Sequence, residues 1–201
     1  MIRFDELNIN RYCDGLIPAI IQDNTTLKVL MLGYMNAEAF ERSIKSGHVT
    51  FFSRTRGELW TKGETGGNFL NIASVSTDCD NDTLLFRVNP VGPVCHLVTQ
   101  SCFGEDNNEG FIRLLEKIIK DRHREMPEGS YTAKLFDRGM AKIAQKVGEE
   151  AVETVIEAVL GNREAMICEA SDLVYHLLIL LEASGCSISD IENELQKRRG
   201  Q

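Results

Sequence analysis

Apolar side chains recur with two different periods along this chain. Up to about residue 103, short runs of β-branched and aromatic residues, as at 49–52 and 84–88, alternate with clusters of Gly, Asn, Asp and Pro. Such runs predict β-strands joined by turns. One helix is expected among them, with Asn36 as its N-cap and Gly47 at its end.

From residue 111 onward the apolar positions follow a helical period. The first helix is predicted from Phe111, Leu114, Leu115, Ile118 and Ile119, and it ends before Pro127. Three further helices are expected: one from about Met140 to Gly161, one from Asn162 to near Gly185, and a short one with Ser189 and Glu192 as its capping box.

A polar, acidic stretch at 103–110 separates these two patterns, as a connection between two cores does. We therefore expect an α+β protein. A β-rich N-terminal domain at 1–105 is followed by an all-α helical bundle at 106–201.

The composition is that of an ordinary globular protein, with 201 residues, 43% hydrophobic and 26% charged. Thirty acidic residues against 22 basic ones give a net charge of −8, which disfavours binding to nucleic acid. No apolar run reaches the roughly 20 residues that cross a bilayer, and the first residues are charged. We expect a cytoplasmic protein that binds neither nucleic acid nor membrane.

The chain has six cysteines, and in the cytoplasm they are expected as reduced thiols rather than disulfides. Cys13, Cys168 and Cys186 are expected to be small buried residues. The other three, Cys79, Cys95 and Cys102, are candidate metal ligands.

Carboxylates recur at helical spacing on two successive helices of the second half. They are Glu149, Glu150 and Glu153 on the first helix, and Glu169 and Asp172 on the second. Spacings of three and four residues put each set on one helix face. If the helices are antiparallel neighbours, the carboxylates repel unless a hard cation such as Mg²⁺ lies among them. A solvated acidic face is the alternative.

Magnesium implies a phosphate substrate, whose charge Lys142 and Lys146 are placed to meet. One turn after Asp172, His176 is expected to be a structural histidine with satisfied hydrogen bonds. An apolar stripe marks one face of the first of these helices, so Glu149 and Glu153 lie beside it and are expected to face the partner helix. The stripe consists of Val152, Val155, Ile156 and Val159.

The segments 127–132, 142–153 and 172–176 closely resemble phosphoribosyl-ATP pyrophosphohydrolase, a family of all-α nucleoside-triphosphate pyrophosphatases. The chain matches every acidic position of the general pattern of that group. The resemblance implies that water attacks between the α and β phosphates and that pyrophosphate leaves. It also implies that Glu169 joins the metal ligands or positions the attacking water. The implied Mg²⁺ ligands are Glu149, Glu150, Glu153 and Asp172.

In the first half, Asp78, Asp80 and Asp82 alternate along five residues and point the same way if the segment is extended. An EF-hand is excluded because Thr83 and Asn89 stand where that loop needs Gly and Glu. A metal-binding loop and an ordinary Asp/Asn-rich hairpin turn both remain open.

Cys79, Cys95 and Cys102 lack the close pairing of a structural zinc ribbon. Three thiolates would leave the fourth position of zinc open for water, as a hydrolytic site requires. Small buried cysteines are the alternative.

Motifs covering nearly all of residues 28–103 resemble phosphoribosyl-AMP cyclohydrolase. They lie at 29–36, 51–56, 59–68, 78–82, 92–96 and 101–103. The resemblance implies a homodimer with zinc at the subunit interface, bound by Cys79 of one chain and by Cys95 and Cys102 of the other. It also implies Mg²⁺ on the three aspartates. Residues 66–67 are Gly-Gly where Ser-Gly is expected, a departure that touches no ligand.

That family's reaction opens an adenine ring between N1 and C6, and zinc supplies hydroxide by lowering the pKa of water to about 7. His96 is the candidate general base or proton shuttle. Arg54, Arg56 and Lys62 are candidates for binding the substrate's phosphates. Trp60 is a candidate for stacking on its base, with a core contact as the alternative.

Residue patterns alone indicate a two-domain metalloprotein with a thiolate zinc site and a Mg²⁺-dependent bundle that hydrolyses phosphates. The two resemblances together imply a bifunctional histidine-biosynthesis enzyme acting on phosphoribosyl nucleotides. One alternative is a house-cleaning nucleoside-triphosphate pyrophosphatase with a non-catalytic zinc module. Another is a non-catalytic zinc module joined to a helical dimerisation domain.

Overall fold

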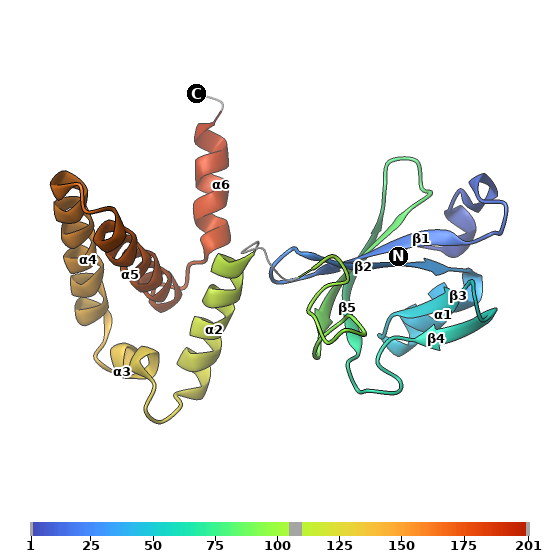
Figure 1. Ribbon diagram of the computed structural model, residues 1–201, viewed down its shortest axis with the longest axis horizontal. Coiled ribbons are helices and arrows are strands. Elements are labelled where there is room, and N and C mark those ends of the chain that lie inside the picture. Colours follow the sequence, from blue (N-terminus) through green and yellow to red (C-terminus); the bar gives the residue numbers. More distant parts are fainter. Residues whose placement is uncertain (1, 105–109, 200–201) are drawn as a thin grey trace. The chain divides into compact units, whose positions relative to one another are not determined.

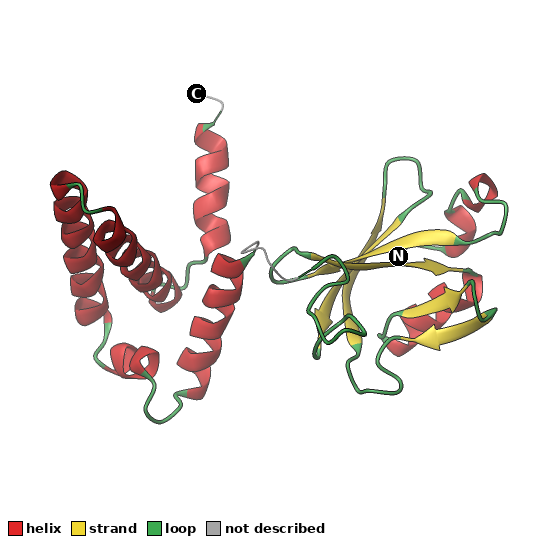
Figure 2. Ribbon diagram, viewed as in Figure 1, coloured by secondary structure: helices red, strands yellow, loops and turns green. Residues whose placement is uncertain are grey.

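The computed structural model describes residues 2–104 and 110–199 (Figure 1). The chain forms two compact units, one up to Gly110 and the other from Phe111. Strands build the first unit and helices the second (Figure 2), which confirms the predicted α+β class and its order along the chain. The predicted boundary between residues 105 and 106 lies outside the described residues.

A four-stranded sheet with the order β2-β1-β6-β5 forms the first unit. Its strands are β1 (Ile17–Asp23), β2 (Val29–Met35), β5 (Leu70–Thr77) and β6 (Leu84–Pro90). The central strands β1 and β6 run parallel, with Ala19 opposite Leu84, and both outer pairs are antiparallel. A separate hairpin contains β3 (Thr50–Ser53) and β4 (Glu58–Thr61). The runs predicted as strands at 49–52 and 84–88 are therefore β3 and β6.

Burial along the central strands alternates with a period of two, as one covered sheet face requires. In β6, Leu84, Phe86 and Val88 are buried while Arg87 is exposed. The helix α1 (Ala37–Ser46) follows β2, and Phe40 joins the same core.

Both ends of α1 were predicted from the sequence and are confirmed. The Asn36 side chain accepts a hydrogen bond from the backbone N–H of Ala39 at 2.8 Å. Gly47 ends the helix in the left-handed region, with φ 74°.

The second unit is a helical bundle. Its helices are α2 (Phe111–Glu125), α3 (Tyr131–Asp137), α4 (Met140–Leu160), α5 (Arg163–Ala183) and α6 (Ile188–Arg198). The two long helices α4 and α5 pack along each other (Figure 1). The buried core of the unit contains Ile119, Leu135, Ile143, Leu178 and Ile179. The spans expected for α2, α4 and α5 are confirmed, whereas α3 was not predicted.

The predicted capping box of α6 is wrong by two residues. The helix begins after Ser187, whose backbone N–H and hydroxyl donate to the Asp190 carboxylate at 2.8 and 2.7 Å. Ser189 and Glu192 instead bind Arg113 of α2. The two side chains that were expected to cap α6 therefore bind α2, a helix far away in the sequence.

The apolar stripe of α4 does not mark the buried face of the helix. Its four valine and isoleucine side chains are 48–82% exposed. The buried positions of α4 are Ile143 and Glu150, which lie on another face of the helix. That face carries Glu150 toward Glu169 and Asp172 of α5.

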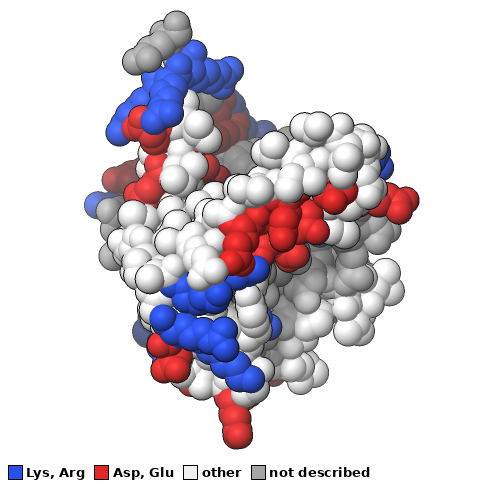
Figure 3. All heavy atoms as spheres, turned by 90° about the vertical axis from the view of Figure 1, so that its left-hand side faces the viewer, with Lys and Arg blue, Asp and Glu red and all other residues white. Residues whose placement is uncertain are grey.

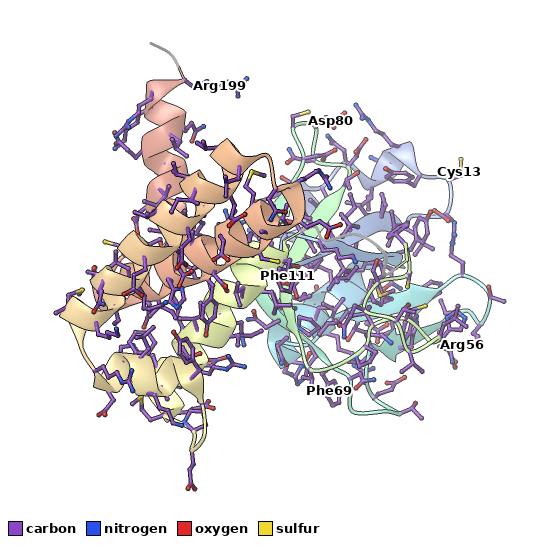
Figure 4. All side chains as sticks on the ribbon, turned by 60° about the vertical axis from the view of Figure 1, so that its left-hand side comes forward. Cys13, Arg56, Phe69, Asp80, Phe111 and Arg199 are labelled. Carbon is purple, nitrogen blue, oxygen red and sulfur yellow. The ribbon has the colours of Figure 1, made fainter. Side chains whose placement is uncertain are left out.

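All six cysteines are free thiols, as expected. The predicted burial of Cys13, Cys168 and Cys186 is wrong, because all three are exposed. Cys13 lies in a turn after η2 (Ile9–Arg11), Cys186 lies in the loop between α5 and α6, and Cys168 lies on an exposed face of α5. The Cys13 side chain points away from its unit in Figure 4. In the described part of the chain, no helix is long and apolar enough to cross a membrane.

Candidate functional sites in the two units

The loop between β5 and β6 gathers three aspartates. Asp78, Asp80 and Asp82 each offer a carboxylate oxygen within 4.8 Å of the others. The segment is a hairpin turn and not the extended run considered above, because Asn81 has φ 58°. Asp78 Oδ1 also accepts the backbone N–H groups of Asp82 and Thr83, both at 3.0 Å. The carboxylates converge because the turn curves.

A basic side chain from the N-terminal segment faces these carboxylates. Arg11, at the end of the 3₁₀ turn η2 (Ile9–Arg11), forms ion pairs with Asp80 and with Asp82, the latter at 2.5 Å. Hydrogen bonding from Arg11 holds the pKa of Asp82 below its usual range. Asp80 lies beside these N-terminal turns in Figure 4. No local pattern of residues predicts this contact, because it joins residues about seventy positions apart.

Two of the three candidate zinc ligands lie together. Cys95 and Cys102 are hydrogen-bond partners, and the pKa of the Cys95 thiol is lowered, first by the backbone of Leu97 and then by the Thr99 side chain. Burial, followed by Cys95, raises the pKa of the Cys102 thiol. Among the described residues, Cys79 forms no group with these two in which three ligand atoms could share a metal ion.

The candidate base His96 adjoins this thiol pair. Its Nδ1 lies 3.8 Å from Cys95 Sγ, and its side chain is exposed. An exposed imidazole at this position can exchange protons with water or with a substrate.

Three of the predicted substrate-binding residues line one cavity of about 260 Å³: Arg56, Trp60 and Lys62. Figure 4 places Arg56 at the end of the β3–β4 hairpin. The Trp60 ring also packs on Phe51, with centroids 5.2 Å apart, so the side chain joins the core and borders the cavity. Gly63 shapes the cavity wall, because with φ 97° any Cβ would meet backbone atoms at about 2.5 Å.

Arg54, the fourth predicted residue, does not line this cavity. Its guanidinium lies over the ring of Tyr34, 3.7 Å from the centroid, in a cation–π contact. The sequence did not indicate Tyr34 as the partner of Arg54.

In the helical unit, α4 and α5 bring carboxylates together. Glu150, Glu169 and Asp172 each offer an oxygen within 4.8 Å of the others, and Glu150 is buried. Burial raises the pKa of Glu169, and the negative charges of Glu153, Glu150 and Asp172 raise it further. Figure 3 shows carboxylate side chains in a band on this unit, with basic side chains beside it.

One of the two candidate lysines lies inside this cluster. Lys146 Nζ is 2.6 Å from Glu150 Oε1 and 3.0 Å from Glu149 Oε2. These hydrogen bonds raise the pKa of Lys146 and lower that of Glu149. Lys142 instead donates to Gln145 at 3.2 Å.

A cavity of about 550 Å³ opens beside the carboxylates. It is lined by Tyr131, Lys146, Glu150, Asp172, Tyr175 and His176. The His176 ring is buried and satisfied, as expected: Nδ1–H donates to the Asp172 carbonyl at 2.9 Å, and Nε2 accepts from the Tyr131 hydroxyl at 3.0 Å. The two tyrosines were not predicted as site residues, although Tyr131 belongs to the segment 127–132.

The donor sets fit different metals. Both acidic clusters offer carboxylate oxygens alone, which suits a hard cation such as Mg²⁺. The paired thiols of Cys95 and Cys102, one of them already inclined to ionise, suit zinc.

Two family models match the chain, one in each unit. Phosphoribosyl-AMP cyclohydrolase matches residues 31–104, and phosphoribosyl-ATP pyrophosphohydrolase matches residues 112–199. The chain is 56% identical to the histidine biosynthesis bifunctional protein HisIE of Bacteroides thetaiotaomicron, over 97% of this chain and 94% of that protein. It is 53% identical to the protein of the same name from Escherichia coli K12, over 92% of each. The chain therefore belongs to the family of bifunctional histidine-biosynthesis proteins that join these two domains.

Proposed function

We propose that this protein carries out two successive hydrolyses in histidine biosynthesis. The helical unit converts phosphoribosyl-ATP to phosphoribosyl-AMP and pyrophosphate, and the β-rich unit opens the adenine ring of phosphoribosyl-AMP. The observation that carries this proposal is that each family match falls within one structural unit, and each unit holds its own cluster of ligating side chains. The C-terminal unit then catalyses the first reaction, and the N-terminal unit catalyses the second.

In the helical unit, the residues fit a Mg²⁺ site. Glu150 and Asp172 would hold the ion, with Glu149 and Glu153 as further candidate ligands, and the bound ion would neutralise the charge of the phosphates. Glu169 is the candidate for accepting a proton from the attacking water, because a carboxylate with a raised pKa is the better base.

The phosphate chain would lie in the adjoining cavity. Lys146 already borders that cavity and carries a positive charge, so it would contact the phosphates, and Lys142 lies one turn away along α4.

In the β-rich unit, the residues fit a zinc site shared between subunits. Cys95 and Cys102 would bind the ion together with Cys79 of a second subunit, and the bound ion would supply hydroxide at neutral pH. His96 would accept or relay the proton, since it adjoins Cys95. Asp78, Asp80 and Asp82 would hold Mg²⁺.

Substrate binding in this unit would use the cavity beside the β3–β4 hairpin. Arg56 and Lys62 would bind the phosphates through their positive charge, and the Trp60 ring would stack on the base. Arg54 is a further candidate whose guanidinium is held by Tyr34. The proposal includes a homodimer, because a zinc site divided between chains requires two copies. It also includes a location in the cytoplasm.

The test is substrate choice. The purified protein is offered phosphoribosyl-ATP and, in parallel, ordinary and damaged nucleoside triphosphates, each with Mg²⁺. We expect pyrophosphate release from phosphoribosyl-ATP and ring opening of supplied phosphoribosyl-AMP. If damaged triphosphates are cleaved while phosphoribosyl-ATP is untouched, the house-cleaning alternative is correct and this proposal is wrong.

A further inference from the structure

A segment outside both family matches holds the aspartate loop of the first unit. Residues 8–12 precede residue 31, where the cyclohydrolase match begins. The backbone N–H of Asn8 donates to the carbonyl of Asn81 at 2.8 Å, and its side-chain amide donates to the Asp80 carbonyl. The Tyr12 hydroxyl donates to the Asp82 carbonyl at 3.1 Å. These three contacts involve main-chain oxygens of the loop and leave its carboxylates free.

Arg11 is the member of the segment that binds the carboxylates. Its Nη1 faces Oδ2 of Asp80 and Oδ2 of Asp82. The Arg11 side chain is 54% exposed, whereas that of Asp82 is only 15% exposed. The Arg11 guanidinium therefore neutralises the partly buried carboxylates of Asp80 and Asp82. Because its own side chain is largely exposed, it can move away from them into solvent.

The guanidinium and a divalent cation would compete for the same oxygens. Two cations a few ångströms apart at a partly desolvated site repel each other strongly. The main-chain contacts of Asn8 and Tyr12 do not depend on Arg11, so the loop can keep its shape when the guanidinium leaves.

We propose that Arg11 is the built-in counter-cation of the Asp78–Asp82 loop and that a divalent cation displaces it on binding. This inference rests on the metal site proposed above. Arg11 holds the carboxylates of Asp80 and Asp82 together in the metal-free chain and thereby lowers the affinity of the loop for metal. It acts through the carboxylates and is a positioning residue rather than a ligand.

The test measures Mn²⁺ binding to the full chain, by calorimetry and by the paramagnetic resonance signal of free Mn²⁺. Replacing Arg11→Gln should tighten binding at the first-unit site about tenfold, since roughly 1.4 kcal/mol of competition corresponds to a factor of ten. Arg3→Gln is the matched control, because Arg3 also precedes β1 but pairs with Asp5 and not with the aspartate loop. It should leave binding unchanged.

Asp80→Asn separates this inference from the proposed site. It should remove one class of Mn²⁺ binding, and Arg11→Gln added to it should then have no effect on binding. If Asp80→Asn removes no binding, the proposed metal site is wrong. If Asp80→Asn removes a site but Arg11→Gln leaves Mn²⁺ affinity equal or weaker, the counter-cation inference is wrong.

A stability measurement and a second variant cover the case in which Arg11→Gln folds poorly. Arg11→Met keeps the apolar stem and should tighten Mn²⁺ binding in the same way. Metal-free Arg11→Met should melt below the wild-type protein, and Mg²⁺ should raise its melting temperature by more than it raises that of wild type. Equal increases in the two proteins would contradict a competition between Arg11 and the metal.

Discussion

At the scale of single residues, each acidic cluster contains a basic side chain of the same chain. Arg11 pairs with Asp80 and Asp82, and Lys146 pairs with Glu149 and Glu150. Carboxylates crowded without such partners would repel one another and take up protons. The clusters can therefore form before any metal binds.

Glu150 is the residue whose loss should affect the helical unit most selectively. Replacing Glu150→Gln removes a buried charge that contacts Lys146, and pyrophosphate release should fall by about 100-fold or more. Ring opening of supplied phosphoribosyl-AMP should persist, because that chemistry lies in the other unit. Both products are measured by chromatography. Glu164→Gln, an exposed change in the first turn of α5, serves as the control. Pyrophosphate release at the wild-type rate would remove Glu150 from the site.

Glu169 makes the metal-free helical unit sensitive to pH. A raised carboxyl pKa means that the native state holds the proton more tightly than the unfolded state does. The free energy of unfolding should then fall as pH rises from the usual glutamate pKa through the raised one. Relative to Glu169→Gln, wild-type protein in chelator should lose melting temperature as the pH rises above the ordinary glutamate pKa of about 4.3, and Mg²⁺ should restore it. A difference between the two proteins that does not vary with pH would contradict this.

The candidate site residues that the structure groups together are those with a local signal in the sequence. Spacings of three residues, together with antiparallel helices, suffice to bring Glu169 and Asp172 to Glu150. Arg11 and Tyr34 had no such signal, because each meets its partner only through the tertiary fold. Such contacts depend on how the strands and loops are arranged in the fold, and the spacing of residues along the sequence does not predict them.

At the scale of elements, prediction succeeded where both ends of a helix carry a chemical signal. Asn36 and Gly47 bound α1, and Gly161 separates α4 from α5. The helix α3 was not predicted because its seven residues are too few for an apolar period to show. Its N-cap Ser130 is a local signal from which its start could be predicted. The apolar stripe on α4 shows a different limit of prediction. Periodicity identifies the apolar face of a helix but does not show whether another element covers that face.

The cap of α1 offers a test at this scale. Asn36→Ala removes the hydrogen bond to the Ala39 N–H and should lower the free energy of unfolding by about 1 kcal/mol. Asn36→Ser keeps an oxygen acceptor and should stay within a few tenths of a kcal/mol of wild type. Denaturant unfolding monitored by Trp60 fluorescence measures both. Equal stability of the alanine and serine variants would show that the cap contributes nothing.

At the scale of the whole molecule, the chain holds two chemistries in two separate units. Cys79 forms no metal-binding group with Cys95 and Cys102 among the described residues, and the zinc site proposed above takes Cys79 from a second copy of the chain. Tethering two units whose product and substrate coincide raises the local concentration of the intermediate.

Subunit mixing tests the shared zinc site. Cys79→Ser and Cys102→Ser should each lose zinc and ring opening while keeping pyrophosphate release. Mixed and allowed to exchange, they should recover about a quarter of wild-type ring opening, because half of the dimers then carry one intact site. Cys186→Ser, an exposed thiol outside the cluster, should behave as wild type. No recovery in dimers shown by mass spectrometry to be mixed, or a fully active monomer in sedimentation, would rule out a site divided between subunits.

A time course with the unmodified protein tests directly whether the two hydrolyses occur, and in which order. Phosphoribosyl-ATP is incubated with Mg²⁺ and trace zinc, and the nucleotides are separated at intervals. We expect phosphoribosyl-AMP to rise and fall while the ring-opened product accumulates, with one pyrophosphate released for each substrate molecule consumed. Permanent accumulation of phosphoribosyl-AMP, or a ring-opened product that still carries the triphosphate, would contradict it.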